Sequence, residues 1–562
     1  MIKLDATYSN DEQKDERIDD AKQRIYNFPQ KIQIDALILK RIFNYLPLSV
    51  IIILSLILRL LAAQESLGFI HPDEVFQSIE MVHFKIFGLY GTGETIPWEF
   101  NTDFDYGGAR SWFFVYILIG LYRFMMLFGI NDPIVLIYGI RVFLSLFSII
   151  TVIVAYFFGK EAFNKTIGLI SSFICGIWWF FPFWASRTMT DSISSDLLFL
   201  SIFLIYKGLK TDILKKKITL SAIAGFLLGL AFMIRFPSAL MVIPLVFVLL
   251  FMASSEVYQR KKQGKISLKE FFKPFYPFLA FCCGAFLMVI AQGILDYFTW
   301  GSFLQSPINF FMYNIVEGNS AHHGIAPWYH YFSGLFHDFG DYFIILFLLF
   351  FVLGIIFNEK IKTKSYMLII CFYWIGVFSL LAHKEFRFIM TLLPIAIILI
   401  ANGIYQFIIL FRKKSYQYTL LSLLLIIFCL GSLYMTAIEK VWIWKFNSGI
   451  CNAMHWVGQQ EDVELVIVFE MVWYTGGYAY LDNNVSVKFT RINFFDPFLH
   501  INSTYYKYLY AQVGTYIVIR SYEFDYYDFY YFNIAEFFDS QNLVQVANIA
   551  GYPNAYVYRS AN

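Results

Sequence analysis

The chain has 562 residues, of which 58% are hydrophobic and only 15% are charged, and its formal net charge is +2. Soluble domains carry about 25% charged residues, so this composition, with a mean hydropathy of +0.58, excludes an ordinary soluble protein and indicates a membrane protein. A net charge so close to zero gives no indication of a nucleic-acid partner. The six cysteines are too few and too scattered for a disulfide framework.

Charge and apolar runs divide the chain into three regions. Residues 1–45 are polar and rich in charge, which predicts a cytoplasmic tail and not a cleavable signal peptide. Residues 46–438 contain repeated apolar runs of membrane-spanning length. Residues 439–562 return to ordinary polarity and predict a small soluble α/β domain. Five short runs in it have the composition of strands: Val463–Phe469, Val485–Phe489, Thr515–Arg520, Leu543–Ile549 and Ala555–Arg559.

The middle region predicts eleven membrane-spanning helices. We expect them near 46–63, 134–158, 167–185, 195–206, 219–234, 238–253, 276–298, 342–357, 366–382, 388–411 and 418–438. A twelfth apolar stretch, 112–129, is expected to lie in the interface or to dip into the membrane without crossing it. No internal repeat is visible, which argues against a transporter built from inverted repeats.

Lysine and arginine predict the orientation of these helices, because cytoplasmic loops are enriched in both. Four loops are strongly basic: 207–217, 260–273, 360–364 and 412–414. The connection 299–341 has neither lysine nor arginine. All four basic loops are cytoplasmic if 112–129 does not cross. The first loop, 64–133, and the C-terminal domain then lie on the lumenal or extracytoplasmic side.

With this orientation, the polar clusters of the middle region share that non-cytoplasmic face. They are His71, Asp73, Glu74, Gln77 and Glu80; Arg110 and Ser111; Arg187, Thr188, Thr190 and Asp191; Arg235; the His-rich segment 322–337; and His383, Lys384, Glu385 and Arg387. Carboxylates are costly beside hydrocarbon, so the acidic pair is a candidate for chemistry. Arginine and lysine suit phosphate oxygens, and a carboxylate can take a proton from a hydroxyl. Together they predict a site for an anionic, lipid-borne substrate, such as an inverting sugar transfer from a phosphate.

Each feature also has a structural alternative. The acidic pair could mark the water interface, and the arginines 110, 187 and 235 could be interfacial anchors. The histidines of 322–337 match no standard zinc spacing, so no metal site is predicted. The aromatic content of 20% fits membrane packing better than a sugar-binding platform. The coincidence of acids and cations on one face is what favours an enzyme.

Six segments, in order along the chain, resemble motifs of glycosyltransferase family 22. They are His71–Glu80, Arg110–Ser111, Arg187–Ser192, Arg235–Pro237, Asn309–Phe332 and His383–Phe388, the last followed by Leu393–Pro394. The first is similar to the first-loop signature of the family, and the last is nearly identical to its late motif. Three features depart from the family pattern: Asp191, where asparagine is more usual; Phe236, where proline usually follows the arginine; and Gly107-Gly108-Ala109, which precedes Arg110.

The resemblance covers roughly residues 46–400 and implies a GT-C fold, an all-α polytopic body of about eleven transmembrane helices. Members of this family are inverting enzymes that take mannose from dolichyl-phosphate mannose and form an α-mannoside on a lipid-borne glycan. The His-Pro-Asp-Glu form is most like the branch that acts on glycosylphosphatidylinositol (GPI) precursors. The implied location is the endoplasmic reticulum membrane, or the plasma membrane in a prokaryote, with the active site on the lumenal or external face. The implied partners are the bilayer, a polyprenyl-phosphate sugar donor and a lipid-linked glycan acceptor.

The resemblance also implies roles for individual residues. Asp73 is the expected general base, and Glu74 is its competitor. Four cations are expected to bind the donor phosphate: His383, Lys384, Arg387 and Arg110. Four more side chains are expected to face the site without an assigned role: His71, Gln77, Arg187 and Arg235. No metal or other cofactor is expected, because fixed cations can balance the phosphate.

Other hypotheses remain open. The same apparatus could serve another sugar, an N-glycan lipid precursor or a prokaryotic glycolipid. A polytopic lipid or solute transporter would carry its charged residues inside the spans, whereas the polar clusters here lie at one face. A non-catalytic subunit could retain the acidic pair only for structure.

Overall fold

A computed structural model of the chain describes residues 45–88, 96–264, 267–339, 341–357, 360–491, 504–521 and 533–561. The predicted tail 1–45 lies outside these residues except for Tyr45. Residues 1–53 and 54–562 are separate units, and the description below concerns the second.

The described residues contain nine helices that are long and apolar enough to cross a membrane. They are Tyr45–Glu65, Pro133–Ala162, Thr190–Leu209, Leu214–Ile234, Phe236–Gln263, Leu268–Trp300, Ile361–Leu380, Phe386–Ile409 and Lys414–Glu439. Each coincides with a predicted span. Shorter apolar helices at Lys165–Ile177 and Ile344–Ile356 fall on the other two predicted spans, and Phe113–Met126 falls on the stretch 112–129. These helices indicate a multi-pass membrane protein.

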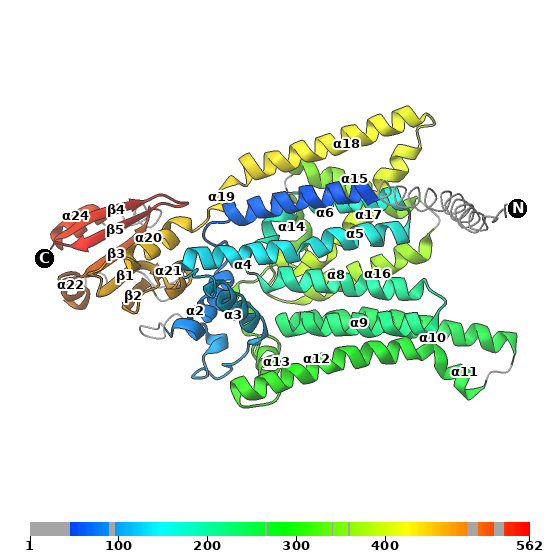
Figure 1. Cartoon of the computed structure of the whole chain (residues 1–562), viewed down its shortest axis with the longest axis horizontal. Helices are drawn as coiled ribbons and strands as arrows, with labels where there is room; N and C mark the ends of the chain where they lie inside the picture. The colour runs from blue at the N-terminus through cyan, green and yellow to red at the C-terminus, as the bar shows by residue number, and fades with distance from the viewer. Residues whose placement is uncertain are drawn as a thin grey trace, which may run out of the picture. The chain divides into compact units, whose positions relative to one another are not determined.

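The regular helices follow one another through the body of the chain (Figure 1). The α-helices are α2 (Glu80–Phe87), α3 (Phe113–Met126), α4 (Pro133–Phe147), α5 (Ile149–Ala162), α6 (Lys165–Ile177), α7 (Phe180–Ala185), α8 (Thr190–Leu209), α9 (Leu214–Ile234), α10 (Val242–Gln263), α11 (Leu268–Phe272), α12 (Tyr276–Trp300), α13 (Gln305–Phe311), α14 (His330–Phe339), α15 (Asp341–Ile356), α16 (Ile361–Leu380), α17 (Leu393–Ile409) and α18 (Lys414–Tyr434). Short 3-10 or π-helical turns are η1 (Val75–Ile79), η2 (Trp98–Phe100), η3 (Phe236–Met241), η4 (Lys273–Phe275), η5 (Met312–Val316), η6 (Asn319–His323), η7 (Phe386–Leu392) and η8 (Met435–Glu439).

The predicted span 167–185 is not one helix. The helix α6 ends at Ile177, and the short helix α7 begins at Phe180. Trp178 has an extended backbone at the end of α6. Four residues later comes Pro182, which has no N–H to bond the carbonyl of Trp178, so a continuous helix would lack that bond.

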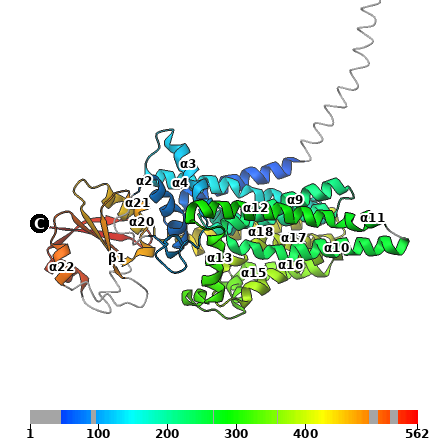
Figure 2. The same cartoon turned by 90° about the horizontal axis from the view of Figure 1, so that it is seen from below.

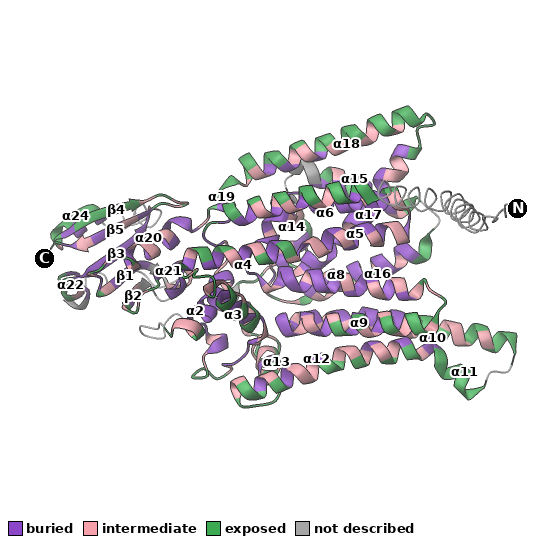
Figure 3. Ribbon diagram, in the orientation of Figure 1, coloured by how far each residue is buried: buried purple, intermediate pink, exposed green. Residues whose placement is uncertain are grey.

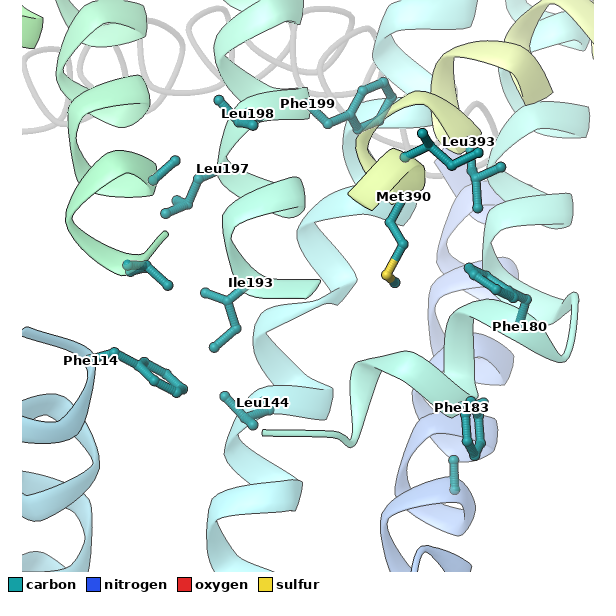
Figure 4. Packing of buried hydrophobic residues seen from close by; sticks show 14 of the residues in the cluster. Phe114, Leu144, Phe180, Phe183, Ile193, Leu197, Leu198, Phe199, Met390 and Leu393 are labelled. Carbon is teal, nitrogen blue, oxygen red and sulfur yellow. The ribbon is translucent and has the colours of Figure 1, made fainter. Parts of the chain in front are cut away.

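The membrane helices pack in pairs that are seen side by side in both views, such as α9 with α12 and α15 with α17 (Figures 1 and 2). The helix α17 is largely buried, whereas α18 is mostly exposed along its length (Figure 3). Between the helices, apolar side chains from α3, α4, α7, α8 and α17 gather in one core (Figure 4). Since lipid tails are as apolar as these side chains, close packing, more than exclusion of water, holds such helices together.

The C-terminal region contains a five-stranded sheet, and all five predicted strands are confirmed. They are β1 (Leu465–Met471), β2 (Ser486–Arg491), β3 (Thr515–Arg520), β4 (Leu543–Ile549) and β5 (Ala555–Ser560). The strand order is β2-β1-β3-β5-β4. The first three strands are parallel, and β5 and β4 are antiparallel to their neighbours. The remaining helices of this region are α19 (Val441–Trp444), α20 (Ser448–Gly458), η9 (Val472–Tyr474), α21 (Tyr478–Leu481), α22 (Thr504–Tyr510) and α24 (Ile534–Ser540).

Helices cover both faces of this sheet. Alternate residues of a strand point to opposite faces, and in β1 Val466 and Val468 join the core that includes α20, whereas Ile467 and Phe469 join a separate core with α22 and α24. The core on the α20 side is continuous with that of the helical body. The C-terminal region therefore packs onto the end of the body that carries α2, which α21 contacts (Figure 1).

The pairing of α15 with α17 predicts an effect on stability. A Cβ atom at Gly403 would lie 1.8 Å from the carbonyl oxygen of Phe350, so Gly403→Ala must push the helices apart. We expect a loss of about 1–3 kcal/mol, the usual cost of overpacking, measured as a lower Tm in detergent. The control is Gly376→Ala in α16, where a Cβ meets nothing within 4 Å in the part of the chain that the structure describes. That change should be neutral or stabilising by about 0.5–1 kcal/mol, and equal losses at both sites would contradict the packing argument.

Candidate active site

The acidic pair stands at the start of a continuous helix that runs from residue 73 through η1 and α2 to Phe87. The carbonyl of Pro72 accepts hydrogen bonds from Val75 and Phe76, which closes the first turn. Proline is favoured at the start of a helix because its missing N–H is not needed there. The next residues form the π-helical turn η1, and such turns are frequent at functional sites.

Asp73 lies in a cluster of charged side chains at this helix start. Its Oδ2 is 2.9 Å from Nη1 of Arg387, and its Oδ1 is 3.5 Å from Nδ1 of His71. The side chain keeps 22% of its surface exposed. Burial by itself would raise the pKa of Asp73, but His71 and Arg387 outweigh that effect and hold its pKa well below the usual range. Asp73 is therefore an ionised carboxylate that remains open to a ligand.

Arg387 is the centre of the cluster. Glu385 faces it with both carboxylate oxygens, at 2.6 Å and 2.7 Å, and Oδ2 of Asp191 is 3.8 Å away. With Asp73, three carboxylates from three separate segments surround one guanidinium. Burial opposes ionisation of Glu385, but Arg387 and the hydrogen bond from His383 hold the pKa of Glu385 well below its usual range.

Arg235 extends the cluster on the far side of Asp191. Its Nε is 2.5 Å from Oδ1 of Asp191, and its guanidinium stacks 5.1 Å from the ring of Phe388. A small hollow adjoins Arg235 and Arg387 and is lined in part by Ser194, Ser195, Ser238 and Thr391.

A second acid, Glu99, lies near enough to Asp73 for the two carboxylates to interact. Gln77, one helical turn after Asp73, donates a hydrogen bond of 2.8 Å to Oε1 of Glu99, and Nη2 of Arg110 is 3.7 Å from the same oxygen. Burial raises the pKa of Glu99; Arg110 opposes this rise, and the carboxylate of Asp73 adds to it. No sequence motif pointed to Glu99, because it belongs to none of the six segments quoted above.

Hydrogen bonds on both sides of Arg110 hold the backbone in place, one of them from the motif segment 309–332. Nδ2 of Asn309 donates to the carbonyl of Gly107 at 2.8 Å, and Ser111 donates to Gln292 at 2.7 Å. Nε of Arg110 is buried and has no hydrogen-bond partner among the described residues.

Glu74 is placed differently from Asp73. Its carboxylate accepts the backbone N–H groups of Ile70 and His71, and its Oε2 lies 3.5 Å from Nη1 of Arg187. Its side chain is 2% exposed and that of Arg187 is 0% exposed. Both side chains are therefore buried, and their partners are other groups of the protein.

The two residues before Glu385 also have internal partners. The ammonium of Lys384 donates to the carbonyls of Ala326 and Leu381. Nε2 of His383 lies 2.8 Å from Glu385, and this hydrogen bond raises the pKa of His383.

The structure thus brings together His71, Asp73, Gln77, Arg110, Arg235, His383 and Arg387 in one connected region. Glu74, Arg187 and Lys384 border this region from within the fold. Sequence reasoning did not assign roles to Glu385, Asp191 or Glu99, although the first two stood in the quoted motifs. The described residues contain no group of three or more metal-ligating side chains.

The charge balance around Arg387 predicts how stability depends on pH. Arg387→Met leaves the carboxylates of Asp73, Glu385 and Asp191 without their cation, so we expect the protein to lose about 3–5 kcal/mol near neutral pH. The wild type should keep its Tm between pH 7.5 and 5, because the pKa values of Asp73 and Glu385 are held low in the fold and their contribution to stability is lost only below about pH 5. In the variant the repelling carboxylates take up protons more readily, so Tm should rise between pH 7.5 and 5. The measurement is thermal unfolding in detergent at both pH values.

Arg260→Met is the matched control. It breaks an exposed ion pair with Glu256 on α10, and such pairs contribute about 0–1 kcal/mol. A Tm of Arg387→Met that does not rise between pH 7.5 and 5 would contradict the charge balance described here.

Comparison with known proteins agrees with the fold and the motifs. The model of the Alg9-like mannosyltransferase family matches residues 50–481. "Mannosyltransferase APTG1" of Arabidopsis thaliana is 26% identical over 334 residues, which cover 59% of this chain and 54% of that protein. Human "GPI alpha-1,2-mannosyltransferase 3" is 25% identical over 330 residues, covering 58% and 52%. "GPI mannosyltransferase 4" of Eremothecium gossypii is 26% identical over 359 residues, covering 62% and 63%. The chain thus spans little more than half the length of these relatives.

Among solved structures, ArnT from Cupriavidus metallidurans bound to undecaprenyl phosphate aligns with a TM-score of 0.55 at 10% sequence identity, covering 92% of this chain and 98% of ArnT. The apo form of ArnT gives the same TM-score at 11% identity. This likeness shows a shared GT-C fold. The six ordered motifs, this fold and a family match over most of its length show that the chain belongs to the Alg9-like mannosyltransferase family.

Proposed function

We propose that the chain is an inverting α-mannosyltransferase that transfers mannose from dolichyl-phosphate mannose to a lipid-linked glycan, with a GPI-anchor precursor as acceptor. The observation that carries this proposal is the carboxylate of Asp73, ionised and partly exposed between Arg387 and His71. Membership of the mannosyltransferase family supports the sugar, and the printed names of the relatives support the GPI acceptor. The bound undecaprenyl phosphate of ArnT supports a polyprenyl-phosphate donor.

In the proposed reaction, Asp73 takes the proton of an acceptor hydroxyl. The acceptor oxygen then attacks the anomeric carbon of mannose while the bond from that carbon to the phosphate oxygen breaks. Attack from the side opposite the phosphate inverts the anomeric centre. The departing dolichyl phosphate keeps the bonding electron pair and needs no proton, because cations can balance its charge.

Asp73 suits the base better than Glu74. A general base must reach the proton it removes, and the carboxylate of Asp73 retains exposed surface, whereas that of Glu74 is enclosed by two backbone N–H groups and Arg187. We propose that Glu74 instead fixes the bend before the helix.

Arg110 is the cation best prepared to bind the donor phosphate. Its Nε has no hydrogen-bond partner among the described residues, Glu99 lies 3.7 Å from its Nη2, and the ring of Phe310 lies 5.8 Å from the guanidinium. Arg387 already faces three carboxylates, and Lys384 is bonded to two carbonyls. We propose that Arg110 contacts the phosphate first, that Arg387 and His383 contribute through the charge of the cluster, and that no metal takes part.

The proposed location is the endoplasmic reticulum membrane, with this site on the lumenal face.

The base assignment predicts the outcome of Asp73→Asn. In proteoliposomes with radiolabelled dolichyl-phosphate mannose and a dimannosyl GPI precursor, the variant should lose about 10²- to 10⁴-fold in transfer rate, the usual contribution of a general base. Asp103→Asn, an exposed acid of the same loop, is the control and should keep wild-type activity. A parallel assay offers an N-glycan lipid precursor as acceptor. Label on that precursor alone would assign the chain to the branch that elongates N-glycan precursors. Normal transfer by Asp73→Asn would exclude this residue as the base.

The phosphate assignment predicts different effects of two neutral replacements. Arg110→Gln should raise the KM for the donor roughly 10-fold or more, because a hydrogen bond to a charged group contributes about 1.5–3 kcal/mol, and should leave the KM for the acceptor unchanged. Lys384→Met should lower the Tm without a selective change in the donor KM, because it removes hydrogen bonds within the protein. Arg123→Gln on the exposed side of α3 is the control. Equal changes in both KM values for Arg110→Gln would argue against a phosphate contact.

A further inference from the structure

The segment before the acidic pair is paired with the C-terminal region. The backbone N–H of Phe69 donates to the carbonyl of Phe446 at 3.0 Å, and Nδ2 of Asn447 donates to the carbonyl of Phe69 at 3.2 Å. Arg520 on β3 donates in turn to Oδ1 of Asn447 at 3.0 Å. Phe69, two residues before His71, is thus held by residues almost 380 positions later in the chain.

Two buried arginines strengthen this pairing from the helical body. The carbonyl of Gly68 accepts a hydrogen bond of 2.6 Å from Arg141 on α4 and one of 3.4 Å from Arg187. Arg141 also donates to the hydroxyl of Tyr480, and Arg187 donates to the carbonyl of Ile443. Each arginine therefore joins the segment before His71 to the C-terminal region.

The same region holds the helix of Asp73 farther along. The carboxylate of Glu80, the first residue of α2, is 1% exposed. Its two oxygens accept the backbone N–H groups of Tyr478 at 3.0 Å and Ala479 at 2.7 Å. Two hydrogen bonds to one buried charge make a strong and directional contact.

Glycines stand at both contact points and allow the close approach. A Cβ at Gly68 would lie 2.3 Å from the carbonyl oxygen of Phe446, and a Cβ at Gly477 would lie 2.6 Å from Oε2 of Glu80. Both glycines also have positive φ angles, +68° and +67°, which other residues rarely adopt.

We propose that residues 443–481, here named the clamp, form part of the catalytic apparatus. The clamp holds the chain on both sides of Asp73, at Gly68 and Phe69 before it and at Glu80 after it. Glu80 is a positioning residue that sets the carboxylate of Asp73 against Arg387. This inference rests on the proposed function. The family model ends at residue 481, directly after α21, so the clamp lies inside the matched region, whereas β3, β4 and β5 lie beyond it. The clamp makes no contact with substrate in this proposal and acts through the position of Asp73.

Kinetics of Glu80→Gln in the mannosyl-transfer assay test the proposal. Glutamine replaces one acceptor oxygen by an NH₂ group, which cannot accept from a backbone N–H. We expect kcat to fall roughly 10- to 100-fold, since a misplacement of about 1 Å can cost 10² in rate, with unchanged KM values for donor and acceptor. The acid limb of the kcat profile should move to higher pH, because Asp73 drawn away from Arg387 becomes easier to protonate. A purely structural contact would lower the Tm without moving this limb.

A glycine pair supplies a matched second test. Gly477→Ala should reproduce the kinetic effect, because its Cβ collides with Glu80. Gly88→Ala at the end of α2 has nearly the same φ, +66°, but its Cβ meets no atom of the described residues within 4 Å. It therefore carries the backbone strain without the collision and should retain the wild-type kcat. Equal losses at Gly477 and Gly88, or none at Gly477 and Glu80, would overturn the clamp.

Hydrogen exchange of the purified full chain separates this inference from the proposed function. Glu80→Gln and Gly477→Ala should each speed amide exchange of residues 69–80 relative to the wild type, and Gly88→Ala should not. Absence of any transfer by the wild type would reject the proposed function, and exchange would still decide whether the clamp holds the helix. Unchanged exchange in both Glu80→Gln and Gly477→Ala would overturn the inference, whatever the transfer assay shows.

Discussion

The pairing of Arg387 with Asp73, Glu385 and Asp191 is the interaction on which the candidate site depends. The three carboxylates come from the first loop, the start of α8 and the segment before η7, so one guanidinium joins parts of the chain that are far apart in sequence. A buried arginine without such partners would be costly, and so would carboxylates gathered without the arginine. The need to satisfy all of these charges at once fixes the relative positions of the three segments.

The same constraint gives the site its chemical character. Opposite charges keep Asp73 and Glu385 ionised despite burial, whereas Glu99, which faces its cation at a longer distance, has a raised pKa. Groups whose surroundings drive their pKa values apart are typical of acid–base sites. Asp73 combines a firm ionic partner with remaining exposed surface, as Glu385 also does, whereas its sequence neighbour Glu74 is enclosed. Of the acidic pair, Asp73 alone has the combination that a base in a glycosyl transfer requires.

The C-terminal region completes this arrangement from the other side of the first loop. Two arginines, Arg141 and Arg187, meet at the carbonyl of Gly68, and the carboxylate of Glu80 is held by backbone N–H groups of the C-terminal chain. The helix that begins at Asp73 therefore has a fixed partner on each side. A loop held only by its own residues would be free to move on the timescales typical of surface segments.

The sequence by itself determined the class of the protein, the positions of its apolar helices, the five C-terminal strands and the membership of a family. These depend on local composition and periodicity, such as the alternating apolar residues of β1, or on short motifs such as His71–Glu74, and both can be read along the chain. Only the tertiary structure decided which charged groups meet. Asp73 and Glu74 are neighbours in sequence, but successive helix positions point in directions about 100° apart, so one faces Arg387 and the other Arg187. Lys384 and Arg387 share a motif, yet one binds carbonyls and the other carboxylates, because their partners come from distant segments whose positions local sequence does not encode.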